Sequence, residues 1–178
     1  MRSSACEELF LQLKDTAWPY TYTDHERQIA RAIVFDGEGF FYFVRVHWDD
    51  QFGKGVFIET SGGGIEAGEE PETAIRRELK EELGAEIDVI CKLGVVSDYY
   101  NLIHRHNVNH YYLCKLLSVG STSMTEEEIR DFQLSALRLR YEEAAAEYRK
   151  NAATPWGSLL CQRELPILER AKKILEEL

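Results

Sequence analysis

A helix-forming segment between two glycine-bearing turns is the feature that most constrains the fold of this chain. Residues 63–85 read GGIEAGEEPETAIRRELKEELGA. Pro71 suits the first turn of a helix, and Gly84 suits the position just past its end. The apolar positions between them recur at helical spacing and form one stripe, which consists of Ile75, Leu79 and Leu83. The pattern predicts a helix over residues 71–83 with one buried face.

Strand-like segments lie on both sides of this helix. They are rich in β-branched and aromatic residues, or alternate apolar with polar residues, and they cover residues 27–35, 40–46, 56–59, 87–95, 108–117 and 134–139. The turn-forming run 36–39 predicts a hairpin between the first two. Residues 98–107 are polar and are predicted to form a loop.

Further helices are predicted towards both ends of the chain. Residues 4–7 have the form of a capping box, which predicts a short helix that ends before Trp18. Residues 125–128 can cap a short helix, and 141–150 are rich in Ala and Glu. The last helix should start or kink at Pro166, and its apolar positions are Leu168, Ala171, Leu175 and Leu178. This amphipathic helix could support a homodimer.

The order of these elements predicts a mixed sheet covered by helices, in the α/β class (α+β type). The 178 residues contain no linker long enough to separate domains and fit one domain. We expect a core over about 25–150, a short N-terminal helical extension, and a longer C-terminal helical extension over about 151–178.

Composition excludes several classes of function. The 21 Lys and Arg residues against 31 Asp and Glu residues give a net charge of −10, which argues against direct DNA or RNA binding. No apolar run approaches the roughly 18 to 20 residues that span a bilayer, so no membrane helix is expected. The start of the chain lacks a signal-peptide pattern, which predicts a cytoplasmic protein. The four scattered cysteines fit reduced thiols: Cys6, Cys91, Cys114 and Cys161.

The charge pattern of the central helix points to a metal. At 100° per residue, Glu78, Glu81 and Glu82 fall within one arc beside the apolar stripe. Like charges three or four residues apart cost about 0.2–0.5 kcal/mol per pair, whereas a hard cation such as Mg²⁺ or Mn²⁺ between them makes the cluster favourable. A solvated surface helix is the alternative. The preceding glycines let a metal or phosphate approach the backbone, but acidic residues follow them where a P-loop carries Lys.

These residues resemble the Nudix box. Gly63, five residues, Glu69, seven residues and then the run from Arg77 to Ala85 match every fixed polar residue and glycine of that pattern. The strand order is also similar over about 25–150. The resemblance implies a Nudix-like, MutT-like α/β/α sandwich that hydrolyses a nucleoside diphosphate linked to another moiety, with Mg²⁺ or Mn²⁺. Two positions depart from the family: Ala85 replaces a larger aliphatic residue, and Ser61 stands where many relatives have proline.

The resemblance also implies roles for the residues of the box. Glu81 and Glu82 would be the principal metal ligands, and Glu78 would be a further ligand or the general base. The Gly63 carbonyl would be another ligand. An ion pair between Glu69 and Arg77 would anchor the loop to the helix and orient Glu78.

Residues outside the box supply candidates for further contacts. Glu126 and Glu127, in the acidic run after the box, could add a metal ligand or a base, or could merely favour a helix start. Arg45 and Trp48 precede the glycine loop, where a phosphate could bind or a base could stack, although packing also explains Trp48.

The segment from Tyr99 to His110 is rich in aromatic residues and histidines. Tyr99, Tyr100 and His104 are candidates for contacts with the substrate. His104 and His106 could share a face, but no acid or cysteine completes a zinc ligand set. A loop that lines the pocket and a plain surface loop both remain open as alternatives.

The sequence therefore predicts a metal-dependent pyrophosphohydrolase whose partner is a small-molecule nucleotide diphosphate. The alternative is a catalytically silent sensor with the same fold, which binds a nucleotide without cleaving it. The intact box favours the enzyme, because a pure binder has no need of a base at Glu78.

Overall fold

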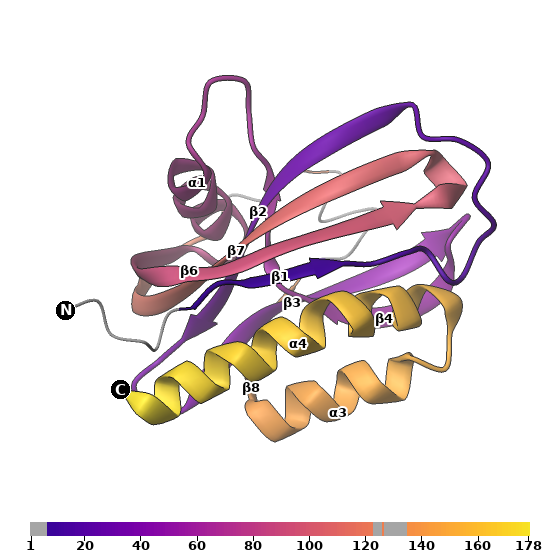
Figure 1. Cartoon of the computed structure of the whole chain (residues 1–178). Helices are drawn as coiled ribbons and strands as arrows, with labels where there is room; N and C mark the ends of the chain where they lie inside the picture. Colours follow the sequence, from indigo (N-terminus) through magenta and orange to yellow (C-terminus); the bar gives the residue numbers. More distant parts are fainter. Residues whose placement is uncertain (1–6, 123–125, 127–134) are drawn as a thin grey trace.

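The chain folds around one mixed sheet (Figure 1). We describe residues 7–122, 126 and 135–178 of a computed structural model. Within these residues the sheet has eight strands. They are β1 (Leu9–Gln12), β2 (His25–Phe35), β3 (Phe40–Asp50), β4 (Gly53–Glu59), β5 (Ser61–Gly64), β6 (Ala85–Tyr100), β7 (Arg105–Val119) and β8 (Ser135–Arg140).

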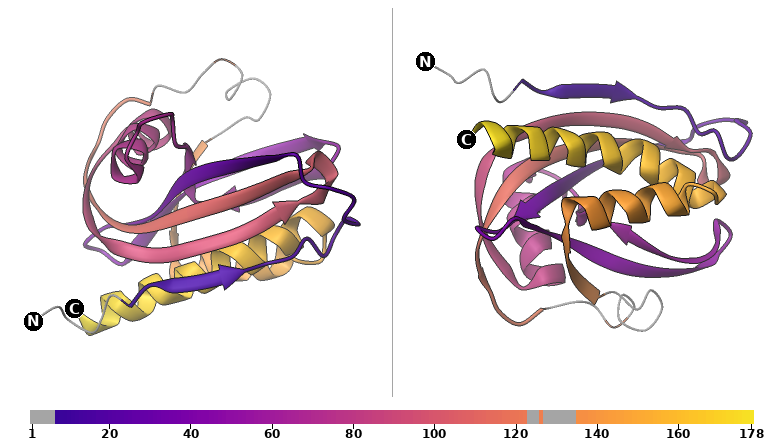
Figure 2. Two further views of the ribbon diagram at one scale, coloured as in Figure 1. Left: turned by 45° about the horizontal axis from the view of Figure 1, so that its top comes forward. Right: turned by 90° about the horizontal axis from the view of Figure 1, so that it is seen from below.

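Helices cover the sheet on two sides. The helices in the described residues are α1 (Pro71–Leu83), α3 (Tyr141–Asn151), α4 (Pro155–Glu177) and the short 3₁₀ helix η2 (Asn101–Ile103). Helices α3 and α4 lie side by side on the face opposite α1, as Figure 2 shows. This arrangement confirms the predicted α/β/α layers, the mixed sheet and the C-terminal helical extension.

The pairing of β2 creates an opening in the sheet. The strand order is β1-β6-β7-β2-β3-β4, in which β1–β6 and β2–β7 are parallel pairs. Strand β2 pairs with β3 only at Val34 and Phe35, whereas its residues 29–32 pair with β5. The predicted hairpin is therefore present, but its strands diverge away from the turn (Figure 1). The space between them is where the candidate site lies.

Each helix layer has its own apolar core. The predicted stripe of α1 packs against small residues of β2, and the cluster includes Ala30, Ala32, Ile75, Leu79 and Leu83. On the other face, α3 and α4 pack against β2, β3, β6 and β7, with a core that includes Ile33, Phe43, Leu113, Ile167 and Leu168. Alternate residues of β2 thus face opposite helix layers.

The prediction of an N-terminal helix is wrong for the part of it that the structure describes. Residues 9–12 form β1, which pairs in parallel with residues 94–97 of β6. Leu9 and Leu11 face inward while Phe10 is exposed, so the apolar residues alternate as in a strand. Gly94, at φ +152°, allows this pairing because a side chain there would clash with the Leu9 backbone. The predicted capping residues 4–6 lie outside the described residues.

The prediction of a polar loop at 98–107 is also wrong. Strand β6 continues to Tyr100 and β7 begins at Arg105, so only η2 and His104 separate them. His104 closes this turn with φ 56°. Asp98 and Asn107 are polar yet buried in the sheet, on the side that faces α4. Asp98 accepts a hydrogen bond from Asn109 at 2.9 Å and lies 3.4 Å from Arg163, so its polarity reflects buried contacts and not exposure to solvent.

The last helix is longer than predicted, because it begins at Pro155 and continues through Pro166. The Thr154 hydroxyl caps it by accepting a hydrogen bond from the Gly157 amide at 3.1 Å. Buried residues on both sides of Pro166 hold the helix together despite the missing backbone donor. The apolar face of α4 packs on the core of this chain and is therefore not available to a second copy. The homodimer stays a prediction.

Two further expectations concern cysteines and membranes. Cys91, Cys114 and Cys161 are free, and Cys114 is fully buried while the others are half-buried; Cys6 lies outside the described residues. Among the described helices, none combines the length and the apolar character that crossing a membrane requires.

Candidate active site

The glycine turn and α1 bring the residues of the box together. Helix α1 has the bounds that the sequence predicts, with Pro71 at its start and Gly84 in the left-handed conformation at φ 63° just past its end. Its buried stripe fixes the rotation of the helix against β2. The glutamates beside that stripe therefore face β5 and the mouth of the cleft.

Arg77 joins the loop to the helix. Its Nε and Nη2 atoms donate to the two carboxylate oxygens of Glu69, each at 3.0 Å, in a bidentate pair. Nη2 also donates to the Gly64 carbonyl at 3.1 Å, and Nη1 donates to Glu78 at 2.7 Å. The bond to Glu69, followed by those to Glu78, raises the pKa of Arg77. The predicted ion pair is therefore present, and it also holds Glu78.

Glu78 lies directly over the glycine turn. A Cβ atom on Gly63 would clash with the carboxylate of Glu78. Only glycine at this position lets the carboxylate approach the backbone so closely. The Gly63 backbone and the Glu78 carboxylate therefore lie against each other.

Glu82 is a buried carboxylate, with 8% of its surface exposed. The Ser61 hydroxyl and the Gly62 amide both donate to its Oε2, the latter at 3.0 Å. Burial raises the pKa of Glu82 to about 7, although these two hydrogen bonds oppose the shift. Ser61, which departs from the family pattern, thus has a definite contact with the box.

The third glutamate of the predicted arc lies further out. Glu81 keeps 43% of its side chain exposed, and its carboxylate lies 3.7 Å from Nη1 of Arg77. Within the described ranges, no three acidic, histidine or cysteine side chains are close enough to hold a metal ion. The three glutamates therefore share one side of α1 without forming a compact ligand set. Glu126 is helical and exposed, and Glu127 lies outside the described residues.

A cleft of about 250 Å³ adjoins Glu82 and Gly63. Val44, Val46 and Trp48 of β3 form one wall. The wall formed by β2 and β7 carries three cations, Arg27, Arg31 and Arg105, which sequence reasoning missed. Arg27 and Arg31 lie four residues apart and so share one face of a strand, which was the available signal.

Among the five candidates for substrate contacts, Trp48 alone lines this cleft, and its Nε1 donates to Glu59 at 3.2 Å. Arg45 is on the opposite face of β3, in a hollow with Glu147 and Lys150. His104 stacks on Tyr22 at the turn between β6 and β7, with ring centroids 3.9 Å apart. The prediction that Arg45 and His104 reach the same site as the box is not supported by these positions.

The two tyrosines at the end of β6 point to opposite faces. Tyr99 stacks on His106 and lines a separate hollow of about 630 Å³ beside the loop between β1 and β2. Tyr100 is buried, and its hydroxyl contacts Arg163 of α4. Burial raises the pKa of Tyr100 to about 12. Neither hydroxyl lines the cleft beside the box.

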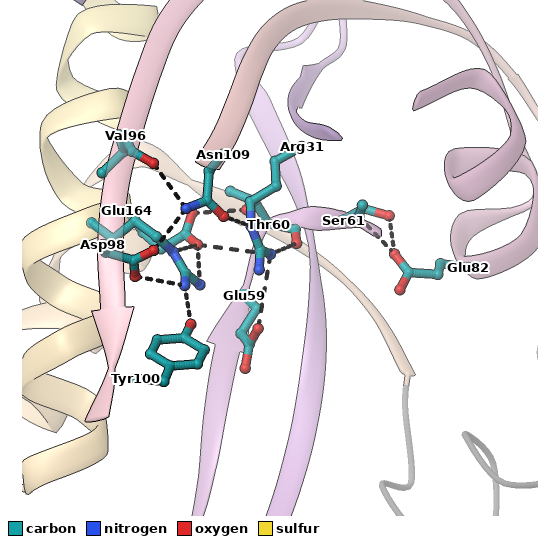
Figure 3. A network of polar contacts seen from close by, with 12 residues as sticks. Arg31, Glu59, Thr60, Ser61, Glu82, Val96, Asp98, Tyr100, Asn109 and Glu164 are labelled. Atoms are coloured by element: carbon teal, nitrogen blue, oxygen red, sulfur yellow. Dashed lines mark hydrogen bonds and ion pairs between the residues drawn. The ribbon is translucent and has the colours of Figure 1, made fainter. Parts of the chain in front are cut away.

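A buried polar network connects the cleft to α4 (Figure 3). Arg31 donates to Asn109 at 3.0 Å and to the Thr60 carbonyl at 3.4 Å. The Thr60 hydroxyl donates to Glu164 at 2.8 Å. Arg163, the neighbour of Glu164, lies 3.4 Å from Asp98. Through Thr60, the network reaches the strand that carries Ser61.

The fold and the site together define an α/β/α protein with a carboxylate-bearing helix beside a cationic cleft. A family model described as NUDIX domain matches residues 25–156, which is most of the chain. The chain belongs to the NUDIX domain family, whose members typically depend on a divalent metal.

Two solved structures show the same fold. The solution structure of the E. coli ORF135 protein is similar at 20% identity and a TM-score of 0.58, with 85% of this chain and 92% of that chain covered. A NUDIX hydrolase from Nitrosomonas europaea is similar at 12% identity and a TM-score of 0.60, with 85% and 88% covered. A comparison with curated protein sequences gave no match.

Proposed function

We propose that this chain is a metal-dependent pyrophosphohydrolase that cleaves a diphosphate linkage in a nucleoside diphosphate linked to another moiety. The observation that carries the proposal is Glu82, a buried carboxylate at the cleft that has no cation within ion-pair distance among the described residues. An ionised carboxylate in such a place is costly unless a cation joins it. The complete box around it supports the same conclusion.

The residues at this point suit a hard divalent cation. Glu82, Glu78 and the Gly63 carbonyl offer oxygen donors, with Glu81 at the rim. The bare glycine backbone lets the Glu78 carboxylate lie against it, where a Cβ atom would clash. When bound, Mg²⁺ or Mn²⁺ would lower the pKa of a water molecule and neutralise charge on the phosphates.

The protein residues would orient the reacting groups. Arg77 donates to Glu78 and holds it against the glycine turn, so Glu78 can act as a ligand or as the general base that accepts the proton of water. Ser61 and the Gly62 amide orient Glu82. The arginines of β2 and β7 would attract the phosphates, while Val44 and Val46 exclude water from one wall.

The test is hydrolysis by the wild-type protein and by Glu82→Gln. The substrates are nucleotide sugars, dinucleoside polyphosphates, ADP-ribose and oxidised nucleotides with Mg²⁺ or Mn²⁺, and released phosphate is read after phosphatase treatment. We expect Glu82→Gln to lower turnover by orders of magnitude while the protein stays folded. Arg45→Gln, on the opposite face of β3, is the matched control and should keep wild-type turnover.

Equal turnover of Glu82→Gln and wild type on an accepted substrate would reject the proposal. Tight, stoichiometric nucleotide binding without any product would support the sensor instead.

A further inference from the structure

The cationic wall of the cleft is built from two paired strands. Arg27 of β2 is in register with Asn107 of β7, and Arg105 lies two residues before Asn107. Residues two apart on a strand point to the same face, and partners in a ladder share a face. Arg27, Arg105 and Asn107 are therefore neighbours on one face of the sheet. Arg27 and Arg105 line the cleft that contains Glu82 and Gly63.

These arginines differ from Arg31 in their partners. Arg31 donates to Asn109 and to the Thr60 carbonyl, and Glu59 and Glu164 each lie 4.0 Å from it. Arg27 has no ion pair or hydrogen bond with the described residues; it is exposed and lies against the backbone of Gly64. Arg105 and Asn107 are the neighbours of Arg27 on β7. Their surroundings therefore decide what this wall of the cleft can bind.

Arg105 is half-buried, yet its Nε makes no hydrogen bond with any described residue. Its guanidinium lies 5.0 Å from the centroid of the Tyr100 ring. Burial lowers the pKa of Arg105, and the charges of Arg27 and Arg31 lower it further, although Tyr100 opposes them. Like charges held together at a cleft are unfavourable unless an anion joins them.

Asn107 supplies an independent observation. It is fully buried, and neither its amide nitrogen nor its amide oxygen has a hydrogen-bond partner among the described residues. A buried polar group without a partner costs about 1–3 kcal/mol. Such groups in a folded protein usually indicate an ion, a water molecule or a ligand. The unpartnered amide lies beside two arginines that form no ion pair with any residue the structure describes.

We propose that Arg27 and Arg105, with Asn107 as their buried neighbour, form an anion subsite in which the two arginines bind one phosphate of the substrate directly, beyond the phosphates next to Glu82 and Gly63. A diphosphate at the carboxylate end would be neutralised by divalent cations. Two further arginines are needed only when the substrate carries a third phosphate. The subsite therefore selects substrates with three or more phosphates in a row over diphosphates that end in a neutral group. This inference rests on the proposed function for its meaning, but its binding test does not.

The test measures binding of inorganic triphosphate to the full chain by calorimetry, without added metal and at low ionic strength. Because guanidinium contacts to phosphate are charge-assisted, we expect Arg27→Gln and Arg105→Gln each to weaken binding at least about tenfold, which corresponds to about 1.4 kcal/mol. Arg45→Gln, which removes one cation from the other face of β3, should stay within about twofold of wild type. Arg27→Lys should bind triphosphate more tightly than Arg27→Gln and less tightly than the wild type. Lysine keeps the positive charge but lacks the planar guanidinium that donates two parallel hydrogen bonds.

A second measurement compares kcat/KM for a nucleoside triphosphate and a nucleotide sugar with Mg²⁺. The preference for the triphosphate should fall at least about tenfold in Arg27→Gln, mainly through KM. If Arg105→Gln fails to fold, Arg27→Gln still tests the subsite, because Arg27 is exposed and its substitution should leave the protein folded.

Triphosphate affinity that is the same in Arg27→Gln and Arg45→Gln would overturn the subsite, whether or not the protein hydrolyses anything. Arginine-dependent binding in a wild-type protein that hydrolyses no substrate would support the subsite and reject the proposed function.

Discussion

Two buried glutamates, Glu82 on α1 and Glu164 on α4, accept hydrogen bonds from two residues that follow one another in the chain (Figure 3). The Ser61 hydroxyl donates to Glu82, and the Thr60 hydroxyl donates to Glu164 at 2.8 Å. Glu164 also lies 2.8 Å from Nη2 of Arg163 and 4.0 Å from Arg31.

The two carboxylates differ in whether a cationic side chain of the described residues lies beside them. Glu164 is fully enclosed and has arginines of its own chain as counter-ions. Glu82 faces the cleft, has no such counter-ion among the described residues, and has its pKa raised to about 7 by burial. A buried carboxylate needs a partner of opposite charge. Helix α4 thus carries a completed ion pair, whereas the buried carboxylate of α1 lacks a counter-ion in the described residues.

The largest expected effect on stability comes from breaking the completed pair. Glu164→Ala should lower the free energy of unfolding by about 3–5 kcal/mol, because it removes a buried counter-ion that lies beside both Arg163 and Arg31. Urea titration followed by circular dichroism measures this loss. Glu169→Ala, which removes an exposed partner of Arg149 on the same helix, should cost less than about 1 kcal/mol.

In contrast, Glu82→Gln should leave the free energy of unfolding unchanged or higher, since it removes an uncompensated buried charge. If Glu82→Gln lost as much unfolding free energy as Glu164→Ala, the two carboxylates would be equivalent and the distinction drawn between them would be wrong.

A smaller effect is expected from adding the cation. Mn²⁺ at about 100 times its dissociation constant should stabilise the wild-type protein by about 2.7 kcal/mol. Glu82→Gln should lose most of this stabilisation, because the amide carries no charge. The measurement is the unfolding free energy with and without Mn²⁺, and Arg45→Gln serves as the control. Equal stabilisation of Glu82→Gln and wild type would place the cation elsewhere.

The smallest effects concern the two hydroxyls. Thr60→Val and Ser61→Ala should each lower the free energy of unfolding by about 1–2 kcal/mol, because each removes a buried hydrogen bond to a carboxylate. Added Mn²⁺ should reduce the loss in Ser61→Ala, where the cation supplies a new partner to Glu82. It should leave the loss in Thr60→Val unchanged, since Glu164 already has its arginines. Identical responses of both variants to Mn²⁺ would contradict this distinction.

Elements with strong local signals were the ones that sequence predicted well. Helix α1 has its predicted bounds because Pro71, Gly84 and the apolar stripe act within a few residues of one another. The bidentate pair of Arg77 with Glu69 could be anticipated from the box, since both residues lie on the same short turn and helix.

Elements that depend on distant partners were predicted poorly. Residues 9–12 form a strand because β6, more than 80 residues later, offers an edge for pairing. Asp98 and Asn107 lie in strands and not in a loop because both are buried in the paired strands β6 and β7, where Asp98 lies 3.4 Å from Arg163 of α4. Local propensity cannot register such contacts.

The sequence by itself determined the family pattern, the bounds of α1 and the glutamates that share one side of it. Only the tertiary structure decided which of them is buried with no counter-ion in the described part of the chain, and which cations face it across the cleft. The physical reason is range: capping and periodicity act within a turn or two, whereas burial and charge compensation depend on strands and helices that are distant in the chain. Arg27, Arg105 and Glu164 acquire their significance only from that packing.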